Sequence, residues 1–280
     1  MIKLQTPVTD APCSVGISYS DKIMMIGSCF TDNIGSLLRN YGFDVCVNPF
    51  GTLYNPASVA ASIDRLINGT PFTETDCVEI GAGDTRTCSF HHHTSFARTD
   101  IKEFLDNANA RLVQACSFFK ECNKVIITLG TSWCYRHVEK NIIVSNCLKR
   151  NPKEFVREFL PSMETASLLK GIMTMCPDKE FIFTVSPIRH FKDGAHGNQL
   201  SKASLLLGIN ETGAEYFPAY EIMMDELRDY RFYAEDMCHP SAQAVNYIGE
   251  RFLAWALPAS EQDRLKENIR AFRHGCHILK

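Results

Sequence analysis

Three residues that lie far apart in the chain have the types needed for chemistry on an acyl group. Ser28 follows the apolar run 22–26, and Asp236 and His239 form an Asp-x-x-His pair near residue 240. A serine hydroxyl, an imidazole that accepts its proton and a carboxylate that orients the imidazole form the machinery of acyl transfer. Each piece also has an ordinary interpretation. Gly-Ser after a strand is commonly only a turn, and Asp-x-x-His-Pro is typical of a capped helix start.

The local pattern around Ser28 favours the catalytic interpretation. Residues 22–26 are typical of a short buried strand, and residues 31–38 carry apolar side chains at helical spacing. Ser28 therefore falls at a strand-to-helix turn. The N-terminus of the following helix directs N–H groups and a partial positive charge toward this place, which suits a developing oxyanion.

The elements that must position these residues alternate along the chain. Apolar runs at 22–26, 43–47, 124–129 and 180–185 predict buried strands, and helical patterns lie near 31–40, 56–67, 101–120, 241–257 and 260–272. This alternation predicts an α/β fold with a parallel sheet, whose ligands bind at the carboxyl ends of the strands. Polar residues gather at those ends: Ser28, Asn48, Gly51, Gly130, Thr131, Ser132, Ser186, Arg189 and His190.

The totals describe an ordinary soluble chain. The 280 residues are 45% hydrophobic, with a net charge of -3, a pI of about 6.3 and a mean hydropathy of -0.12. We expect one domain over 1–280, with candidate inserted hairpin regions near 80–100 and 133–150. Stretches 86–96 and 141–147 are candidates for further strands. The absence of a basic excess argues against nucleic acid and anionic membranes as partners.

The cysteines and the start of the chain indicate a cytoplasmic protein. The 12 cysteines are scattered without any C-x-x-C pair, and several lie in apolar runs. This pattern predicts reduced, buried thiols rather than a zinc site or a disulfide framework. Residues 1–7 lack the charged and apolar regions of a signal peptide, and no apolar run approaches the ~20 residues of a membrane span.

Several motifs together resemble the GSCFA family. The first reads Gly27-Ser28-Cys29-Phe30-Thr31, with Thr in place of the family's Ala. Further matching segments lie at 48–56, 128–131, 144–147, 184–187, 201–202, 216–221 and 236–241. The family is grouped with the SGNH (GDSL-like) hydrolases. The resemblance therefore implies a three-layer α/β/α sandwich with a central parallel, flavodoxin-like sheet.

The SGNH motifs map onto this sequence with one clear departure. The resemblance assigns the nucleophile to Ser28, preceded by Gly27 instead of the usual Asp, and places the last block on Asp236 and His239. Backbone N–H groups of Ser28 and Gly51 would bind the oxyanion. The third block normally supplies an Asn for the same purpose, and here reads Gly130-Thr131-Ser132.

Other side chains are expected to complete the site. Asn146, Ser132 and Asn48 are candidates to replace the missing Asn, and the two asparagines equally suit turn caps. We place Asn146 in the oxyanion hole and expect substrate contacts from Asn48, His93, Ser132 and Arg189. The alternative for Arg189 is a plain surface loop. Trp133 and Tyr135 are candidates to stack on a sugar ring, or to pack in the core.

Two competing chemistries remain near these residues. The run His91-His92-His93 suggests a metal site, but no carboxylate or cysteine stands at a suitable spacing. We therefore expect neither metal nor cofactor. Cys29 could replace Ser28 as the nucleophile, because a helix N-terminus can lower a thiol pKa. The family resemblance selects the serine.

The sequence thus predicts a serine esterase of SGNH type that hydrolyses a small acyl ester through a Ser28-His239-Asp236 triad. The substrate would be a small molecule or a carbohydrate, with an O-acetyl group as one candidate. Acyl transfer by the same triad is one alternative. A non-catalytic ligand-binding module on the hydrolase fold is the other, favoured by the missing Asn and opposed by the intact triad.

Overall fold

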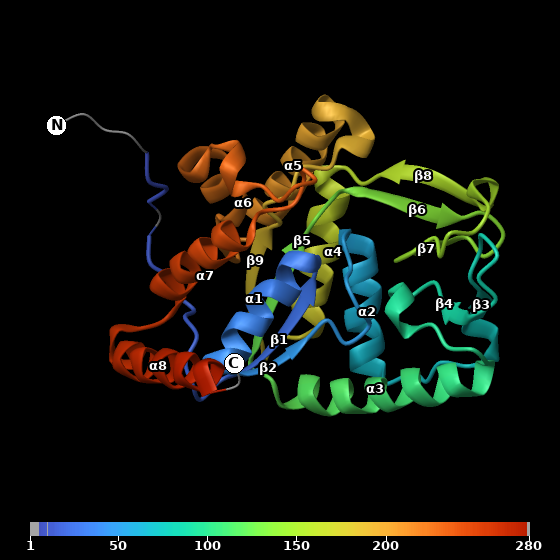
Figure 1. The fold of residues 1–280 in the computed structure, drawn as a ribbon. Helices are drawn as coiled ribbons and strands as arrows, with labels where there is room; N and C mark the ends of the chain where they lie inside the picture. Colours follow the sequence, from blue (N-terminus) through green and yellow to red (C-terminus); the bar gives the residue numbers. More distant parts are fainter. Residues whose placement is uncertain (1–5, 10, 279–280) are drawn as a thin grey trace.

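The computed structural model describes residues 6–9 and 11–278, with side chains up to residue 275. Its centre is a five-stranded, all-parallel sheet in the order β10-β9-β5-β1-β2 (Figure 1). The strands are β1 (Lys22–Gly27), β2 (Asp44–Val47), β5 (Lys124–Leu129), β9 (Glu180–Val185) and β10 (Glu215–Phe217). This confirms the predicted α/β class and the flavodoxin-like strand order.

Helices cover both faces of the sheet and make it a three-layer sandwich (Figure 1). On one face lie α2 (Pro56–Asn68), α3 (Ile101–Glu121), α4 (Ser162–Met175) and α5 (Gly194–Asn210). On the other lie α1 (Cys29–Asn40) and α7 (Ala242–Ala256), with α6 (Ala219–Glu221), a π-helical turn at Ile222–Leu227 and α8 (Gln262–Ile278) beside them. Each face of the sheet has its own hydrophobic core, and alternate residues of a strand pack into one or the other. Met24 and Ile26 pack on one face, and Ile23 and Met25 pack on the other.

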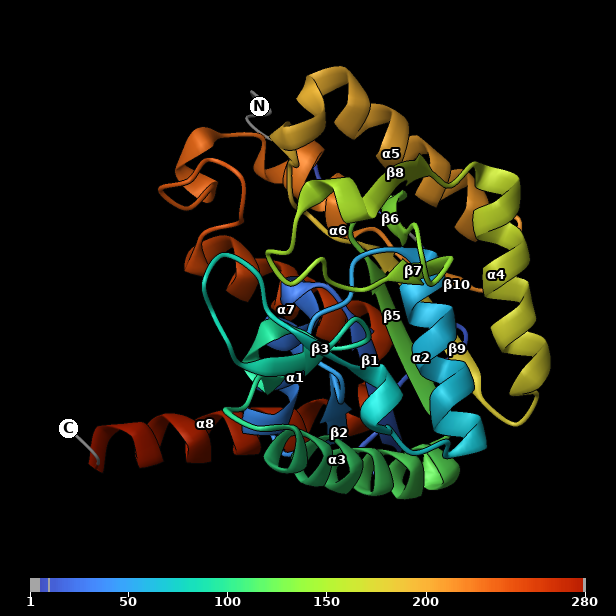
Figure 2. The ribbon, with the colours of Figure 1, turned by 90° about the vertical axis from the view of Figure 1, so that its right-hand side faces the viewer.

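Two small antiparallel sheets lie outside the central one. The first pairs β3 (Cys77–Glu79) with β4 (Thr87–Ser89), and the second has the order β7-β6-β8. Its strands are β6 (Trp133–His137), β7 (Ile142–Val144) and β8 (Phe155–Phe159). Both sheets lie on the side of α2, as Figures 1 and 2 show. They fall in or beside the two segments for which hairpins were expected.

The first helix begins where its sequence provides a cap. Ser28 is the N-cap of α1, and its Oγ accepts a hydrogen bond from the Phe30 N–H at 3.3 Å. Phe30, Ile34 and Leu38 follow at a spacing of four and pack on the sheet. The chain can make this sharp junction because Gly27 has φ = 151°, a backbone conformation that L side chains rarely adopt. Strand β1 therefore delivers Ser28 to the carboxyl edge of the sheet.

Within the described residues, no helix has both the length and the apolar character needed to cross a lipid bilayer. No disulfide joins the eleven cysteines whose side chains the structure describes. The predictions on thiols and on a signal peptide also involve Cys276 and residues 1–5. These residues lie outside the described side chains.

Candidate active site

Asp236 and His239 form a hydrogen-bonded pair. The Asp236 Oδ2 lies 2.6 Å from the His239 Nδ1, and its Oδ1 accepts the N–H groups of Cys238 and His239, each at 2.9 Å. These contacts with His239 and Cys238 lower the pKa of the Asp236 carboxyl to about 2, so it is ionised at neutral pH. A carboxylate on Nδ1 orients the ring and leaves Nε2 as the candidate base. Both side chains are about half exposed, at 51% and 45%.

Ser28, the candidate nucleophile, is fully buried. Its hydroxyl donates a hydrogen bond to the Ser186 Oγ at 3.0 Å. Ser186 follows β9 as Ser28 follows β1, and it too is fully buried. Between Ser28 and His239, both of them described residues, the structure has no hydrogen bond. The predicted nucleophile Ser28 is therefore hydrogen-bonded to a second serine, Ser186, to which the sequence assigned no role in the site.

The loop after β9 links the two halves of the predicted triad. Its first residue is Ser186, the partner of Ser28, and three residues later Arg189 binds the His239 loop. The Arg189 N–H donates to the Cys238 carbonyl at 3.1 Å, and the Cys238 thiol donates to the Arg189 carbonyl at 2.8 Å. The loop after β9 thus contacts Ser28 through Ser186, and it contacts the loop of His239 through hydrogen bonds between Arg189 and Cys238.

His190 stands in the same loop. Its Nε2 is buried and has no hydrogen-bond partner among the described residues, and its ring meets Tyr54 edge to face at 6.4 Å. Burial lowers the pKa of His190 to about 4, with the charges of Lys202, His239 and Arg157 adding to the shift. His190 is therefore a neutral imidazole at neutral pH. The sequence indicated it only as a polar residue at a strand end.

The expected oxyanion donors are engaged in the structure. The Ser28 N–H donates to the Thr128 carbonyl at 3.2 Å, because the pairing of β1 with β5 continues one residue beyond β1. The Gly51 N–H donates to the Asn48 carbonyl at 2.8 Å and closes a turn. Neither N–H is free to bind an oxyanion in this arrangement.

Two predicted site residues serve the backbone instead. The Asn146 Oδ1 accepts the Leu148 N–H at 2.8 Å, so its side chain supports a turn, the alternative that the sequence left open. Ser132 is fully buried, and its N–H donates to the Ser201 Oγ at 2.8 Å. Ser132 is as completely buried as Ser28, so contact of either residue with a substrate would require a local rearrangement.

Asn48 links the end of β1 to α1. Its Oδ1 accepts the Gly27 N–H at 2.8 Å, and its Nδ2 donates to the Asp32 Oδ1 at 2.7 Å. Burial raises the pKa of the Asp32 carboxyl, an effect that the hydrogen bond from Asn48 opposes. Asn48 therefore supports the turn that carries Ser28. Asp32, its partner, is a site residue that sequence analysis missed.

A surface pocket of about 780 Å³ opens beside the first turn of α1. It runs along β2 between α1 and α3, and its lining near Ser28 includes Cys29, Asp32, Asn48, Gly51, Thr52, Tyr54 and His93. His93 and Asn48 are thus placed where a substrate could contact them. Arg189 lies elsewhere, in a smaller pocket of about 200 Å³, with its guanidinium 4.8 Å from the Phe191 ring centroid. A larger pocket, of about 860 Å³, is lined by none of the predicted site residues.

The two neighbouring aromatic residues differ in their contacts. The Trp133 ring packs against Phe159 and lies 4.5 Å from the Arg157 guanidinium. The Tyr135 hydroxyl accepts a hydrogen bond from Lys192 at 2.7 Å. Trp133 is therefore packed within the small sheet, and neither ring lines the pocket beside Cys29.

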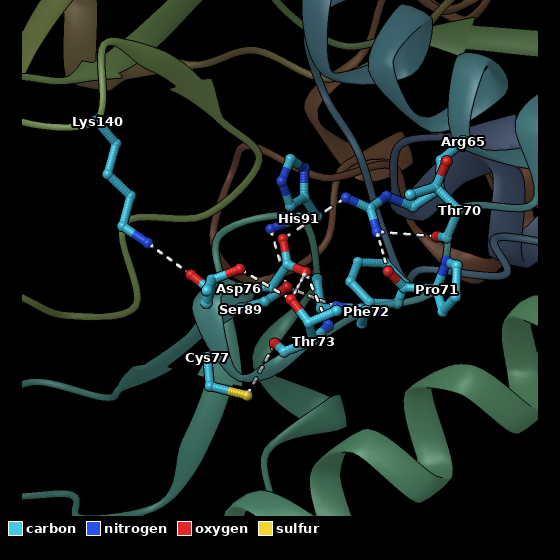
Figure 3. A network of polar contacts seen from close by, with 12 residues as sticks. Arg65, Thr70, Pro71, Phe72, Thr73, Asp76, Cys77, Ser89, His91 and Lys140 are labelled. Atoms are coloured by element: carbon cyan, nitrogen blue, oxygen red, sulfur yellow. Dashed lines mark hydrogen bonds and ion pairs between the residues drawn. The ribbon is translucent and has the colours of Figure 1, made fainter.

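The three consecutive histidines point to different surroundings and do not converge. His91 lies near Asp76 and Arg65, in the polar network at the end of α2 (Figure 3). His92 is fully buried among Phe50, Phe72, Phe96 and Phe104, with its Nδ1 2.7 Å from the Ser89 Oγ, and His93 lines the pocket. Within the described residues, no group of three or more His, Cys, Asp or Glu side chains could hold a metal ion.

The rival nucleophile, Cys29, has the wrong electrostatics. Burial raises the pKa of its thiol, and the Asp32 carboxylate adds to the increase. The backbone N–H groups of Cys29 and Phe30 at the helix N-terminus do lower this pKa, as expected, but burial and the neighbouring anion outweigh them. A protonated thiol is a poor nucleophile.

Comparison with known proteins places the chain in a family. The family model described as "GSCFA family" matches residues 22–252, most of the chain. The protein belongs to the GSCFA family. This GSCFA protein has no match among curated proteins. Among solved structures it is similar to an acetyl xylan esterase, Est2A, from the rumen bacterium Butyrivibrio proteoclasticus, at 12% identity and a TM-score of 0.38. The alignment covers 85% of this chain, which spans 64% of the length of that esterase.

Proposed function

We propose that this GSCFA protein is a serine esterase of SGNH type, with Ser28 as nucleophile, His239 as base and Asp236 as the group that orients the base. The observation that carries the proposal is the Asp236–His239 contact of 2.6 Å, which presents an oriented imidazole on the loop attached to Ser28's partner. Ser28 supports it by its place at the strand-to-helix junction.

The reaction would begin with a rotation of the Ser28 side chain from Ser186 toward His239. The hydroxyl then attacks the ester carbonyl, and its proton passes to His239 Nε2, while Asp236 stabilises the imidazolium. The proposal requires the N–H groups of Ser28 and Gly51 to leave their carbonyl partners and turn to the oxyanion. The ester C–O bond then breaks as the His239 imidazolium gives its proton to the leaving alkoxide, so that the alcohol departs and an acyl-enzyme remains. Water, deprotonated by His239, attacks the acyl-enzyme and releases the acid, and the proton returns to the Ser28 oxygen.

The pocket beside Cys29 supports a small ester of a polar alcohol as the substrate. Thr52, Tyr54 and His93 give its wall hydroxyl and imidazole groups that can hydrogen-bond such an alcohol. A carbohydrate O-acetyl ester is the substrate class that fits this wall and the proposed chemistry.

The test is hydrolysis of an aryl acetate by the native protein, Ser28→Ala and Cys29→Ala. We expect Ser28→Ala to lose all hydrolysis above background, and Cys29→Ala to keep most of it. Ser28→Ala also removes a helix cap, which costs about 1 kcal/mol of stability, so the variant should stay folded. Equal rates in the native protein and Ser28→Ala would overturn the proposal.

The competing function is a non-catalytic ligand-binding module. It is favoured by the complete burial of Ser28, by its hydrogen bond to Ser186 and by the engaged N–H groups of Ser28 and Gly51. A folded native protein that binds acetylated sugars but hydrolyses no ester would favour this module.

A further inference from the structure

Helix α5 buries a polar face against the carboxyl edge of the sheet. The Asn198 Oδ1 accepts the His190 N–H at 3.0 Å, and the Ser201 Oγ accepts the Ser132 N–H at 2.8 Å. A helix that packs on a sheet normally buries apolar residues. This face of α5 instead binds the loops that follow β5 and β9, which carry the candidate site.

Lys202 is the most buried charged group on this face. Its side chain is 1% exposed, and its Nζ donates to the Gly130 carbonyl at 2.7 Å and to the Ser186 carbonyl at 2.9 Å. The Nζ also lies 5.2 Å from the centroid of the Tyr220 ring. Within the described residues, Lys202 forms no ion pair. Burying an ammonium group with only carbonyl acceptors costs stability, and a neutral amide side chain could join two loops at a lower cost.

One residue connects this ammonium group with the nucleophile. The carbonyl of Ser186 accepts from Lys202, and the hydroxyl of Ser186 accepts from Ser28. A positive charge held behind the Ser28–Ser186 pair in a water-excluded interior favours negative charge on Ser28 and on the oxyanion formed by its attack.

We propose that Lys202 is a positioning residue of the candidate esterase site: its buried side chain fixes the loops after β5 and β9 and provides a cation behind Ser28 and Ser186. This inference rests on the proposed function. Lys202 acts through Ser186 and does not touch the substrate.

The charge of Lys202 depends on pH in the neutral range. Burial lowers the pKa of Lys202 to about 7, while Cys238, Cys29 and Glu221 oppose the shift. The titratable or charged groups that face Lys202 are Cys29, His190, Tyr220, Glu221 and Cys238. The protonated form of Lys202 is the one that favours negative charge on Ser28 and the oxyanion. Its effect on the reactivity of Ser28 is therefore largest below about pH 7 and decreases above it.

The experiment measures the rate at which a fluorophosphonate labels Ser28 in the native protein, Lys202→Met and Lys202→Arg. From about pH 6 to about pH 8, we expect the ratio of native to Lys202→Met rates to fall by about tenfold. Lys202→Arg keeps its charge at all these pH values, so it should label faster than the native protein above about pH 7.

Lys124→Met is the matched control. Lys124 is also buried, at 6% exposure, and its Nζ also donates to a carbonyl, that of Val15, at 3.1 Å. Unlike Lys202, it also forms an ion pair, with Glu180. It lies at the amino end of β5, whereas Gly130 follows the carboxyl end of that strand. We expect the ratio of native to Lys124→Met rates to stay constant with pH.

Each outcome decides the matter. A pH-independent ratio for Lys202→Met, in a native protein that is labelled, overturns this inference and leaves the proposed function standing. No labelling of the native protein overturns the proposed function and this inference with it. If Lys202→Met does not fold, Lys202→Arg carries the test. Unfolding of both variants assigns Lys202 to stability alone and overturns the inference.

Discussion

The residues of the candidate triad differ in how far each is prepared for catalysis. Asp236 and His239 are already in contact, through a carboxylate that also holds two backbone N–H groups. Ser28 is buried and bonded to Ser186. Under the proposed function, the structure would correspond to a resting arrangement, in which the base is oriented and the nucleophile still has to turn.

Asp236→Asn tests the oriented base. An amide cannot stabilise the imidazolium and favours the wrong tautomer of His239, so we expect the turnover rate to fall by about 10³–10⁴-fold. Asp84→Asn is a suitable control, because Asp84 is likewise a carboxylate with a pKa of about 2, held there by Arg86. Turnover rates on an aryl acetate check this, and an Asp236→Asn rate close to the native rate would remove Asp236 from the mechanism.

The sequence indicated which side chains were candidates for the site, but not which groups each of them contacts. Asn146 supports a turn, because its Oδ1 finds the Leu148 N–H two residues away. Asn48 lines the pocket, but its amide is occupied by Gly27 and Asp32. Spacing along the chain does not show which of several acceptors a polar group will meet. Ser186 and Lys202 lay in segments that resembled the family, and only the fold brings them to Ser28.

At the scale of elements, the predictable parts were the ones with regular apolar patterns. The strands Lys124–Leu129 and Glu180–Val185 were predicted with the bounds they have, because central parallel strands are buried on both faces. Helix α5 was not predicted. Its buried face carries Asn198, Ser201, Lys202 and Ser204, so the apolar period of a packed helix is missing from its sequence.

Gly27→Ala tests the strand-to-helix junction. A Cβ at Gly27 would lie 2.2 Å from the Thr128 carbonyl oxygen, a backbone atom that cannot move aside. With the added strain at φ = 151°, we expect a loss of about 2–4 kcal/mol in the free energy of unfolding. Gly171→Ala is the control: it lies inside α4 with open space around it, and alanine there should stabilise by up to about 1 kcal/mol. Denaturant unfolding checks both, and equal stabilities would contradict this account of the junction.

At the scale of the whole molecule, the strand alternation predicted a parallel sheet, and the family resemblance supplied the strand order. Periodicity along a chain shows which residues are buried but not which strand lies beside which. The small sheets at 77–89 and 133–159 were expected only as candidate hairpins or further strands, because their strands are short and partly exposed.

Buried histidines make the stability of the whole fold depend on pH. Burial lowers the pKa of His92 to about 3, and that of His190 to about 4, below the ordinary value of 6.5. Between those values the unfolded chain binds more protons than the folded one, so stability is present above pH 6.5 and is lost on acidification toward pH 3.

His92→Phe tests this dependence. Phenylalanine keeps a ring among Phe50, Phe72, Phe96 and Phe104 but cannot bind a proton. Between about pH 4 and 6 the slope of unfolding free energy against pH should fall by about 1.4 kcal/mol per pH unit. His196→Gln, which changes an exposed histidine, should leave the slope unchanged. Chemical denaturation at several pH values measures this, and an unchanged slope in His92→Phe would remove His92 from the account.

Intact mass after exposure to a fluorophosphonate shows whether Ser28 is an activated nucleophile. We expect one adduct on the native protein, located on Ser28, and none on a folded Ser28→Ala variant. A folded native protein that gains no adduct, or an adduct that persists in Ser28→Ala, would contradict it.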